Sequence, residues 1–171
     1  QMVIYLKKGI ILILGILAVI VMASGCTDSG TTNKTYSNNG VSFTYPGDWS
    51  ELDKSDFQNS GSNVLVAVGD KDKSTFALAT VTIGSNQRLA TTKEWAASYK
   101  SGMLSNGYTF ISEKSRTVDG QNGYEVVMQK SGIYTSNTYF AKDGTPYLAA
   151  FASTSNDEQT VNMILNSLKV P

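Results

Sequence analysis

Histidine is absent from this sequence of 171 residues, and cysteine occurs once, at Cys26. Without histidine the chain lacks the usual general base at neutral pH, the commonest zinc ligand and any catalytic pairing that depends on an imidazole. A single cysteine forms no intramolecular disulfide, and if Cys26 is modified no thiolate remains for a metal site. We therefore expect no enzymatic activity, no metal and no other cofactor.

Clustered charge is also scarce. The chain has 14 basic and 14 acidic residues, and two of the basic ones, Lys7 and Lys8, lie in an N-terminal leader. The remaining 12 basic residues stand against 14 acidic ones, a formal charge of −2. Binding to nucleic acid or to an anionic lipid surface needs a concentrated basic patch. Neither kind of partner is predicted.

The leader has the layout of a secretory signal. Lys7 and Lys8 precede an apolar run over residues 9–22, which is followed by Ala-Ser-Gly and then Cys26. A basic start, an apolar centre and small residues define a signal peptide, and the cysteine after them resembles the lipobox of prokaryotic lipoproteins. We expect residues 1–25 to be removed and Cys26 to carry lipid. The alternative is a retained transmembrane helix of about 17 residues, at the short end of what spans a bilayer.

Both interpretations place residues 27–171 on the extracytoplasmic face of the cell membrane, because the two lysines stay inside. Residues 26–39 are polar and rich in Ser, Thr and Asn, a composition that predicts a flexible tether. The tether contains one Asn-x-Thr sequon at Asn33, which makes this residue a candidate N-glycosylation site. The domain itself is expected over residues 40–171.

Alternation of apolar and polar residues predicts strands over residues 41–45, 63–68, 76–83, 108–118, 123–130, 133–141 and 146–153. Asp-Gly pairs within residues 119–122 and 142–145 predict hairpins, so the last four strands should form an antiparallel meander.

Two helices are predicted, each with an apolar stripe and a capping box at its start. The first covers residues 92–105, where Thr91 and Glu94 form the box and Gly107 ends the helix. The second covers residues 156–169, where Ser155 and Glu158 form the box. Trp49 and Trp95 are expected to lie in the core.

The segment over residues 40–49 reads Gly-Val-Ser-Phe-Thr-Tyr-Pro-Gly-Asp-Trp and resembles the opening of PsbP-like domains. The order of later features is also similar: a helix carrying Trp95, a Gly-Tyr-Glu strand start at residues 123–125, a hairpin and a final amphipathic helix. The resemblance covers residues 40–169. It implies an α+β fold, a central antiparallel β-sheet flanked by helices, the PsbP/Mog1-like α/β/α sandwich. It implies no single activity, because members of this group do unrelated things.

Two sets of residues are candidate sites. Tyr134 and Tyr139 are candidates for partner binding, since a tyrosine offers an apolar ring with a polar tip, although aromatic pairs also simply stabilise sheets. Asp70, Asp72 and Ser74 alternate as at the start of a calcium loop. However, counting from Asp70 the loop lacks the glycine and glutamate that such a loop needs, so we interpret it as a solvated turn.

These observations favour a lipid-anchored, extracytoplasmic binding or assembly module of an archaeal or bacterial cell envelope. It is expected to be monomeric, and the sequence does not identify its envelope protein partner. The alternative is a small-ligand or metal-binding lipoprotein associated with a transporter.

Overall fold

The computed structural model describes residues 32–58, 61–70, 72–82 and 91–171. Its elements, in chain order, are β1 (Lys34–Asn38), β2 (Val41–Tyr45), β3 (Ser50–Glu51), the short 3₁₀ helix η2 (Lys54–Phe57), β4 (Ser62–Gly69), β5 (Ser74–Val81), α2 (Thr92–Ser105), β6 (Thr109–Val118), β7 (Gln121–Lys130), β8 (Ile133–Lys142), β9 (Thr145–Ser153) and α3 (Glu158–Ser167).

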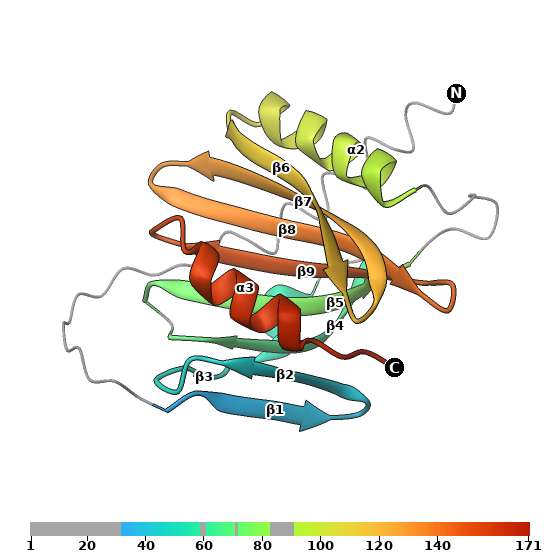
Figure 1. Ribbon diagram of the computed structural model, residues 1–171. Coiled ribbons are helices and arrows are strands. Elements are labelled where there is room, and N and C mark those ends of the chain that lie inside the picture. Colours follow the sequence, from blue (N-terminus) through green and yellow to red (C-terminus); the bar gives the residue numbers. More distant parts are fainter. Residues whose placement is uncertain (1–31, 59–60, 71, 83–90) are drawn as a thin grey trace.

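Seven strands form one antiparallel sheet in the order β3-β4-β5-β9-β8-β7-β6, and β1 pairs with β2 in a separate two-stranded sheet (Figure 1). Successive residues of a strand point to opposite faces. Tyr139 of β8 accordingly packs with α2, whereas the next residue, Phe140, belongs to the cluster around α3. The predicted α+β fold, with helices flanking a central antiparallel sheet, is confirmed.

The larger core lies on the α3 face of the sheet. Val161, Ile164 and Leu165 of α3 are buried there. The β1–β2 hairpin joins this core, since the ring of Phe43 lies 5.1 Å from that of Phe76 on β5. The remaining residues of the cluster come from β4, β5, β6, β8, β9 and the segment after α3, and they include Trp49, a predicted core residue that is indeed buried.

A second core lies between the sheet and α2. Helix α2 contributes the buried side chains of Ala96, Tyr99 and Met103 to it, and β7, β8 and β9 contribute the rest. The helix covers the predicted residues and begins with the predicted capping box, in which Thr91 Oγ1 accepts from the amide of Glu94 and Glu94 Oε2 accepts from the amide of Thr91. Trp95 is only partly buried and packs at the margin of this cluster.

The prediction of a flexible tether is wrong for residues 34–38, which form β1. Asn39 and Gly40 take positive φ angles of 49° and 78°, so a two-residue turn pairs β1 with β2. Tyr36, only 9% exposed, stacks on Phe43 with ring centroids 5.3 Å apart. Burial of the Tyr36 side chain therefore stabilises a strand here, although the other residues of the segment are polar.

The three hairpins of the β6–β9 meander use the same turn. Residues 119–120, 131–132 and 143–144 all have positive φ angles, as a type I′ turn requires at both central positions. The turns predicted as four residues long, 119–122 and 142–145, therefore have only two residues outside the strands.

The second predicted capping box is wrong. Helix α3 begins at Glu158, and its N-cap is Asp157, whose carboxylate accepts from the amide of Thr160 at 3.0 Å. Beyond α3 the chain is extended, and Lys169 exchanges two backbone hydrogen bonds with Ser42 of β2.

Among the helices in the described part of the chain, none has the length and apolar character needed to cross a membrane. The predicted leader, residues 1–25, and Cys26 lie outside the described residues.

Candidate binding surface at the β6 edge

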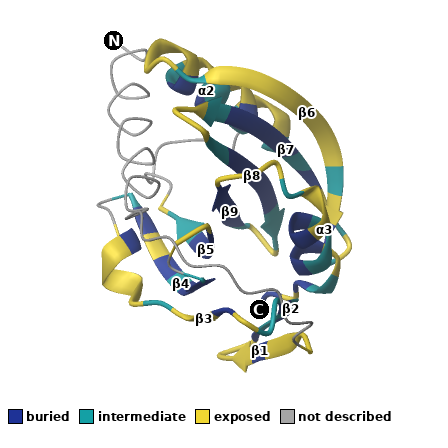
Figure 2. Cartoon of the chain, turned by 90° about the vertical axis from the view of Figure 1, so that its left-hand side faces the viewer, coloured by how far each residue is buried: buried dark blue, intermediate teal, exposed yellow. Residues whose placement is uncertain are grey.

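Strand β6 is the open edge of the seven-stranded sheet. It pairs with β7 on one side only, and Thr109 to Ser115 are all exposed (Figure 2). The opposite edge strand, β3, has only two residues. Open edges usually carry charges that prevent another strand from pairing with them, and β6 carries three charged residues, Glu113, Lys114 and Arg116.

On the α3 face, the basic residues of β6 turn toward a buried carboxylate. Glu125 of β7 is only 2% exposed. Arg116 donates from Nε to Glu125 Oε2 at 2.9 Å, and Ser136 of β8 donates to Oε1 at 2.5 Å. Lys114 Nζ lies 3.7 Å from Glu125 Oε2 and also pairs with Glu158 of α3.

Arg116 extends the same network to α3, because its Nη1 donates to Asn162 Oδ1 at 2.5 Å. Its Nη2 is buried and has no hydrogen-bond partner within the described residues. The network fastens β6, β7, β8 and α3 to one carboxylate.

On the α2 face, the acidic residue of β6 is also paired. Glu113 Oε2 lies 2.6 Å from Lys100 Nζ of α2, and the same ammonium stands 4.8 Å from the centre of the Phe110 ring. The three charged side chains of β6 are thus folded onto the sheet faces, and the backbone edge is left open.

The register shows which backbone groups are free. Val118 and Gln121 flank the two-residue turn and form a hydrogen-bonded pair, as the residues next to a type I′ turn do. Bonded and non-bonded pairs alternate along an antiparallel ladder. The backbone groups of Glu113, Ser115 and Thr117 therefore point away from β7 and toward solvent.

The Gly-Tyr-Glu step noted in the sequence lies opposite this edge, and each residue has a physical role. A Cβ atom on Gly123 would lie 3.0 Å from the Tyr139 carbonyl oxygen, so a larger residue between β6 and β8 would require the neighbouring backbone to shift by a few tenths of an ångström. Tyr124 packs at the margin of the α2 core. Glu125 is the buried centre of the ion-pair network, a role that we did not predict.

Tyr134 and Tyr139 do not form one surface. They are five residues apart on β8 and so lie on opposite faces of the sheet. Tyr139 is fully buried beneath α2, with its ring 5.1 Å from Trp95 and 5.6 Å from Tyr99. Burial raises the pKa of both Tyr99 and Tyr139, so both hydroxyls stay protonated at neutral pH. Tyr134 is half-buried, and partner binding by it stays a prediction.

The Asp70 side chain makes its hydrogen bonds within the β4–β5 connection. Its Oδ1 accepts from the amides of Lys73 and Ser74 at 2.7 and 2.8 Å, so the carboxylate organises the β4–β5 connection. The described part of the chain contains no group of three or more Asp, Glu, His or Cys residues placed to hold a metal.

Asn33 is exposed just before β1, and its glycosylation stays a prediction.

Asp119, in the β6–β7 turn, holds the C-terminal segment. Its carboxylate lies 2.8 Å from Lys142 Nζ and 3.0 Å from Lys169 Nζ, and it accepts from the amide of Val170. Partial burial alone would raise the pKa of Asp119. The hydrogen bonds from Lys142, Lys169 and Val170 outweigh it and lower the pKa to about 2.

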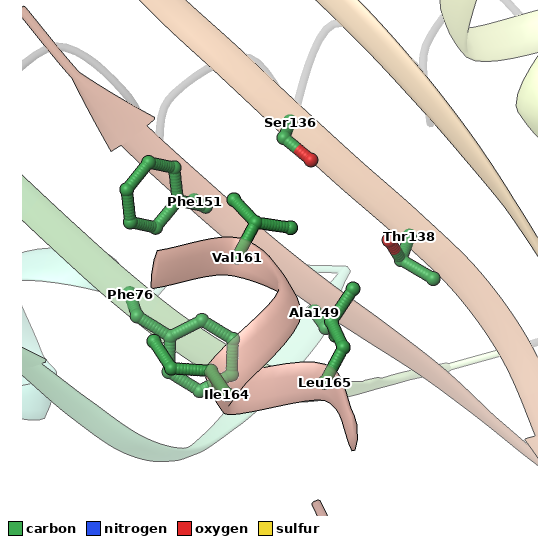
Figure 3. Close-up of a pocket in the computed structure, with 8 residues that line it drawn as sticks. All are labelled: Phe76, Ser136, Thr138, Ala149, Phe151, Val161, Ile164 and Leu165. Atoms are coloured by element: carbon green, nitrogen blue, oxygen red, sulfur yellow. The ribbon is translucent and has the colours of Figure 1, made fainter. Parts of the chain in front are cut away.

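A small cavity lies between α3 and the sheet (Figure 3). Ser136 and Thr138 of β8 line it on the sheet side, and Val161 and Leu165 line it on the helix side. Its volume is about 10 Å³, which is room for one water molecule. It is far smaller than a pocket for a metabolite.

The sequence model of PsbP-like proteins matches residues 10–170. No curated protein matches the chain. Among solved structures, cyanobacterial PsbP (CyanoP) from Synechocystis sp. PCC 6803 has a TM-score of 0.58 and 17% identity, covering 87% of this chain and 98% of that one. This likeness shows the fold.

Two further solved structures are less similar. LpqN of Mycobacterium tuberculosis, described as involved in cell envelope biogenesis, has a TM-score of 0.45 and 16% identity over 82% of this chain and 91% of its own. PA94 of Pseudomonas aeruginosa, a protein of unknown function, has a TM-score of 0.42 and 9% identity over 74% and 86%.

Proposed function

The chain belongs to the PsbP-like protein family, and from that premise we propose that it is a non-catalytic binding and assembly module, lipid-anchored through Cys26 on the extracytoplasmic face of the cell envelope. The leader and the Ala-Ser-Gly-Cys sequence support the anchor. The absence of histidine from the whole sequence supports a role in binding rather than catalysis.

The open edge of β6 is the observation that carries the binding role. It offers ten residues of strand whose charged side chains are engaged within the protein. An exposed edge of this kind binds an extended segment of another protein by adding it to the sheet. We propose that the envelope partner supplies such a segment and pairs with the backbone of Glu113, Ser115 and Thr117.

A small-ligand or metal-binding lipoprotein is the alternative. The described residues give it little support, because their cavity beneath α3 has room for one water molecule and they contain no cluster of metal-ligating side chains.

The binding role is tested by crosslinking and co-purification from native membranes. Ser115→Pro removes one outward-pointing backbone donor, and proline is tolerated at that position of an edge strand. Ser115→Thr keeps the donor and is the matched control. We expect the proline variant to lose the co-purifying partner and the threonine variant to retain it. Equal recovery with both variants would exclude the edge as the binding surface.

The anchor is tested separately. Cys26→Ser should abolish incorporation of a radiolabelled lipid precursor, because the thiol is the acceptor. Continued labelling of this variant would show that the lipobox interpretation is wrong.

A further inference from the structure

Three large apolar side chains are exposed together at one corner of the domain. Leu104 at the end of α2 is 49% exposed, and Phe110 and Ile111 at the start of β6 are 40% and 41% exposed. They are the large hydrophobic side chains that are exposed in the part of the chain that the structure describes. We call this set the apolar corner.

Lys100 of α2 links two of the three residues. Lys100 and Leu104 are one turn apart on α2 and so share a helix face, and Lys100 stands over the ring of Phe110. Ile111 is the extra residue of a β-bulge, since the register with β7 shifts between Phe110 and Ser112. A bulge redirects a side chain relative to its strand, which here leaves Ile111 exposed beside Phe110.

A rim of amphipathic side chains borders the apolar corner. Lys130 Nζ donates to the carbonyl of Asn106 in the α2–β6 turn and lies 5.2 Å from the centre of the Tyr108 ring. Lysine stems and tyrosine rings beside an exposed apolar patch are typical of a surface at a bilayer interface, where the polar tips stay in water.

The length of the tether decides which surface the apolar corner can reach. Cys26 lies eight residues before Lys34, the first residue of β1, and eight residues span at most about 28 Å. A domain of this size has a diameter of roughly 35–40 Å. The start of β1 therefore stays within about 28 Å of the anchor, a distance smaller than the diameter of the domain. Figure 1 shows the starts of β1 and β6 toward its left-hand side, which faces the viewer in Figure 2, with β1 at the bottom of the molecule and the start of β6 at the top.

We propose that the apolar corner inserts into the interface of the bilayer that carries the Cys26 anchor and so sets the orientation of the domain. This inference rests on the proposed lipid anchor. Three side chains are too few to recruit a free protein, but a tether keeps the corner at an effective concentration of about millimolar or more. Insertion by apolar contact needs no basic patch, in agreement with the formal charge of −2. Strand β6 then starts at the membrane and runs outward, presenting Glu113 to Thr117 to a partner.

The test uses the full chain, lipidated on Cys26 and reconstituted into phosphatidylcholine vesicles. A nitroxide is attached at Leu104→Cys or Ile111→Cys, and in the control at Asn122→Cys, an exposed position that pairs with Thr117 at the far end of β6. Relaxation by oxygen, which concentrates in lipid, is compared with relaxation by a water-soluble nickel complex. We expect the labels at 104 and 111 to be relaxed more strongly by oxygen than by the nickel complex. The label at 122 should remain accessible to the nickel complex.

A second variant separates insertion from misfolding. Phe110→Ser with Ile111→Ser should return the label at position 104 to a water-like response, while the protein still sediments with vesicles and keeps its circular dichroism spectrum.

Three results would overturn the proposal. Nickel access at 104 and 111 equal to that at 122, in protein that sediments with vesicles, would leave the anchor intact and exclude insertion. Shielding from both reagents would mean that protein, not lipid, covers the corner. Absence of lipid from Cys26 in protein purified from native membranes would show that the proposed anchor is wrong, a failure distinct from that of insertion.

Discussion

At the scale of single residues, the buried carboxylate of Glu125 joins three strands of the sheet and, through Arg116, helix α3. It contacts Arg116 and Lys114 from β6 and Ser136 from β8, and Arg116 passes the connection to α3. Its surroundings are buried, so a charge left alone there would lack both water and a counter-ion.

We predict that Glu125→Ala lowers the free energy of unfolding by about 3–5 kcal/mol, because it leaves the Arg116 guanidinium buried without its carboxylate. Urea denaturation measures the loss. The double variant Glu125→Leu with Arg116→Leu removes both charges, and we expect it to be more stable than Glu125→Ala. If the double variant is the less stable of the two, the cost lies in lost packing and not in the unpaired charge.

Asp119 gives the stability a dependence on acid pH. Its folded-state pKa of about 2 lies below the ordinary value of 3.8. A lowered carboxylate pKa contributes stability above pH 3.8 that is lost as the pH falls through 2. Between pH 5 and pH 2 the unmodified chain should therefore lose about 1 kcal/mol more of its free energy of unfolding than Asp119→Asn does. This value allows for screening by solvent. Thermal unfolding followed between pH 5 and pH 2 measures it, and equal pH dependence in both proteins would contradict the assignment.

Residue roles were only partly predictable from the sequence. The Gly-Tyr-Glu step was visible, but the partners of Glu125 lie 9 and 11 residues away on other strands, and Asn162 lies 46 residues from Arg116. Only the sheet register brings them together. The opposite placement of Tyr134 and Tyr139, in contrast, follows from strand alternation and was predictable.

At the scale of elements, short turns decide the strand boundaries. The strong alternation of β2 and the meander strands made them predictable, and α2 was predictable because its capping box and apolar stripe agree. β1 was missed because four of its five residues are exposed, so its pattern looks like that of a tether.

Two residues are candidates for the N-cap of α3, and the sequence pattern alone does not decide between them. Ser155 with Glu158 and Asp157 with Thr160 both fit a helix start, and the structure uses Asp157. We predict that Asp157→Ala lowers the free energy of unfolding by about 1 kcal/mol, the usual effect of losing an N-cap. Ser155→Ala, measured in the same chemical denaturation series, should change it little. A larger loss of unfolding free energy in Ser155→Ala than in Asp157→Ala would instead support Ser155 as the N-cap.

At the scale of the whole molecule, the β1–β2 hairpin is part of the domain rather than a lead-in to it. Tyr36 stacks on Phe43, Phe43 contacts Phe76 of the large sheet, and Ser42 is bonded to Lys169 near the C-terminus. A protein that starts at Gly40 would lose β1 and uncover this aromatic chain.

We predict that Tyr36→Ser lowers the free energy of unfolding by about 2 kcal/mol, the effect of exposing one large apolar side chain. Tyr36→Phe keeps the ring and is the control. Differential scanning calorimetry of the full chain compares the two. Similar melting temperatures for Tyr36→Ser and the unmodified chain would mean that β1 is only loosely attached.

The two edges of the large sheet differ in length, with two residues in β3 and ten in β6. Growth of a sheet from molecule to molecule requires that each unit accept a strand on one side and offer one on the other. In this protein the two sides are unequal: β6 is open along its length, whereas β3 covers the Val68–Gly69 end of β4 and η2 contacts the same strand. Strand addition is therefore expected at β6, and assemblies built through that edge alone should be finite, with one added strand for each copy.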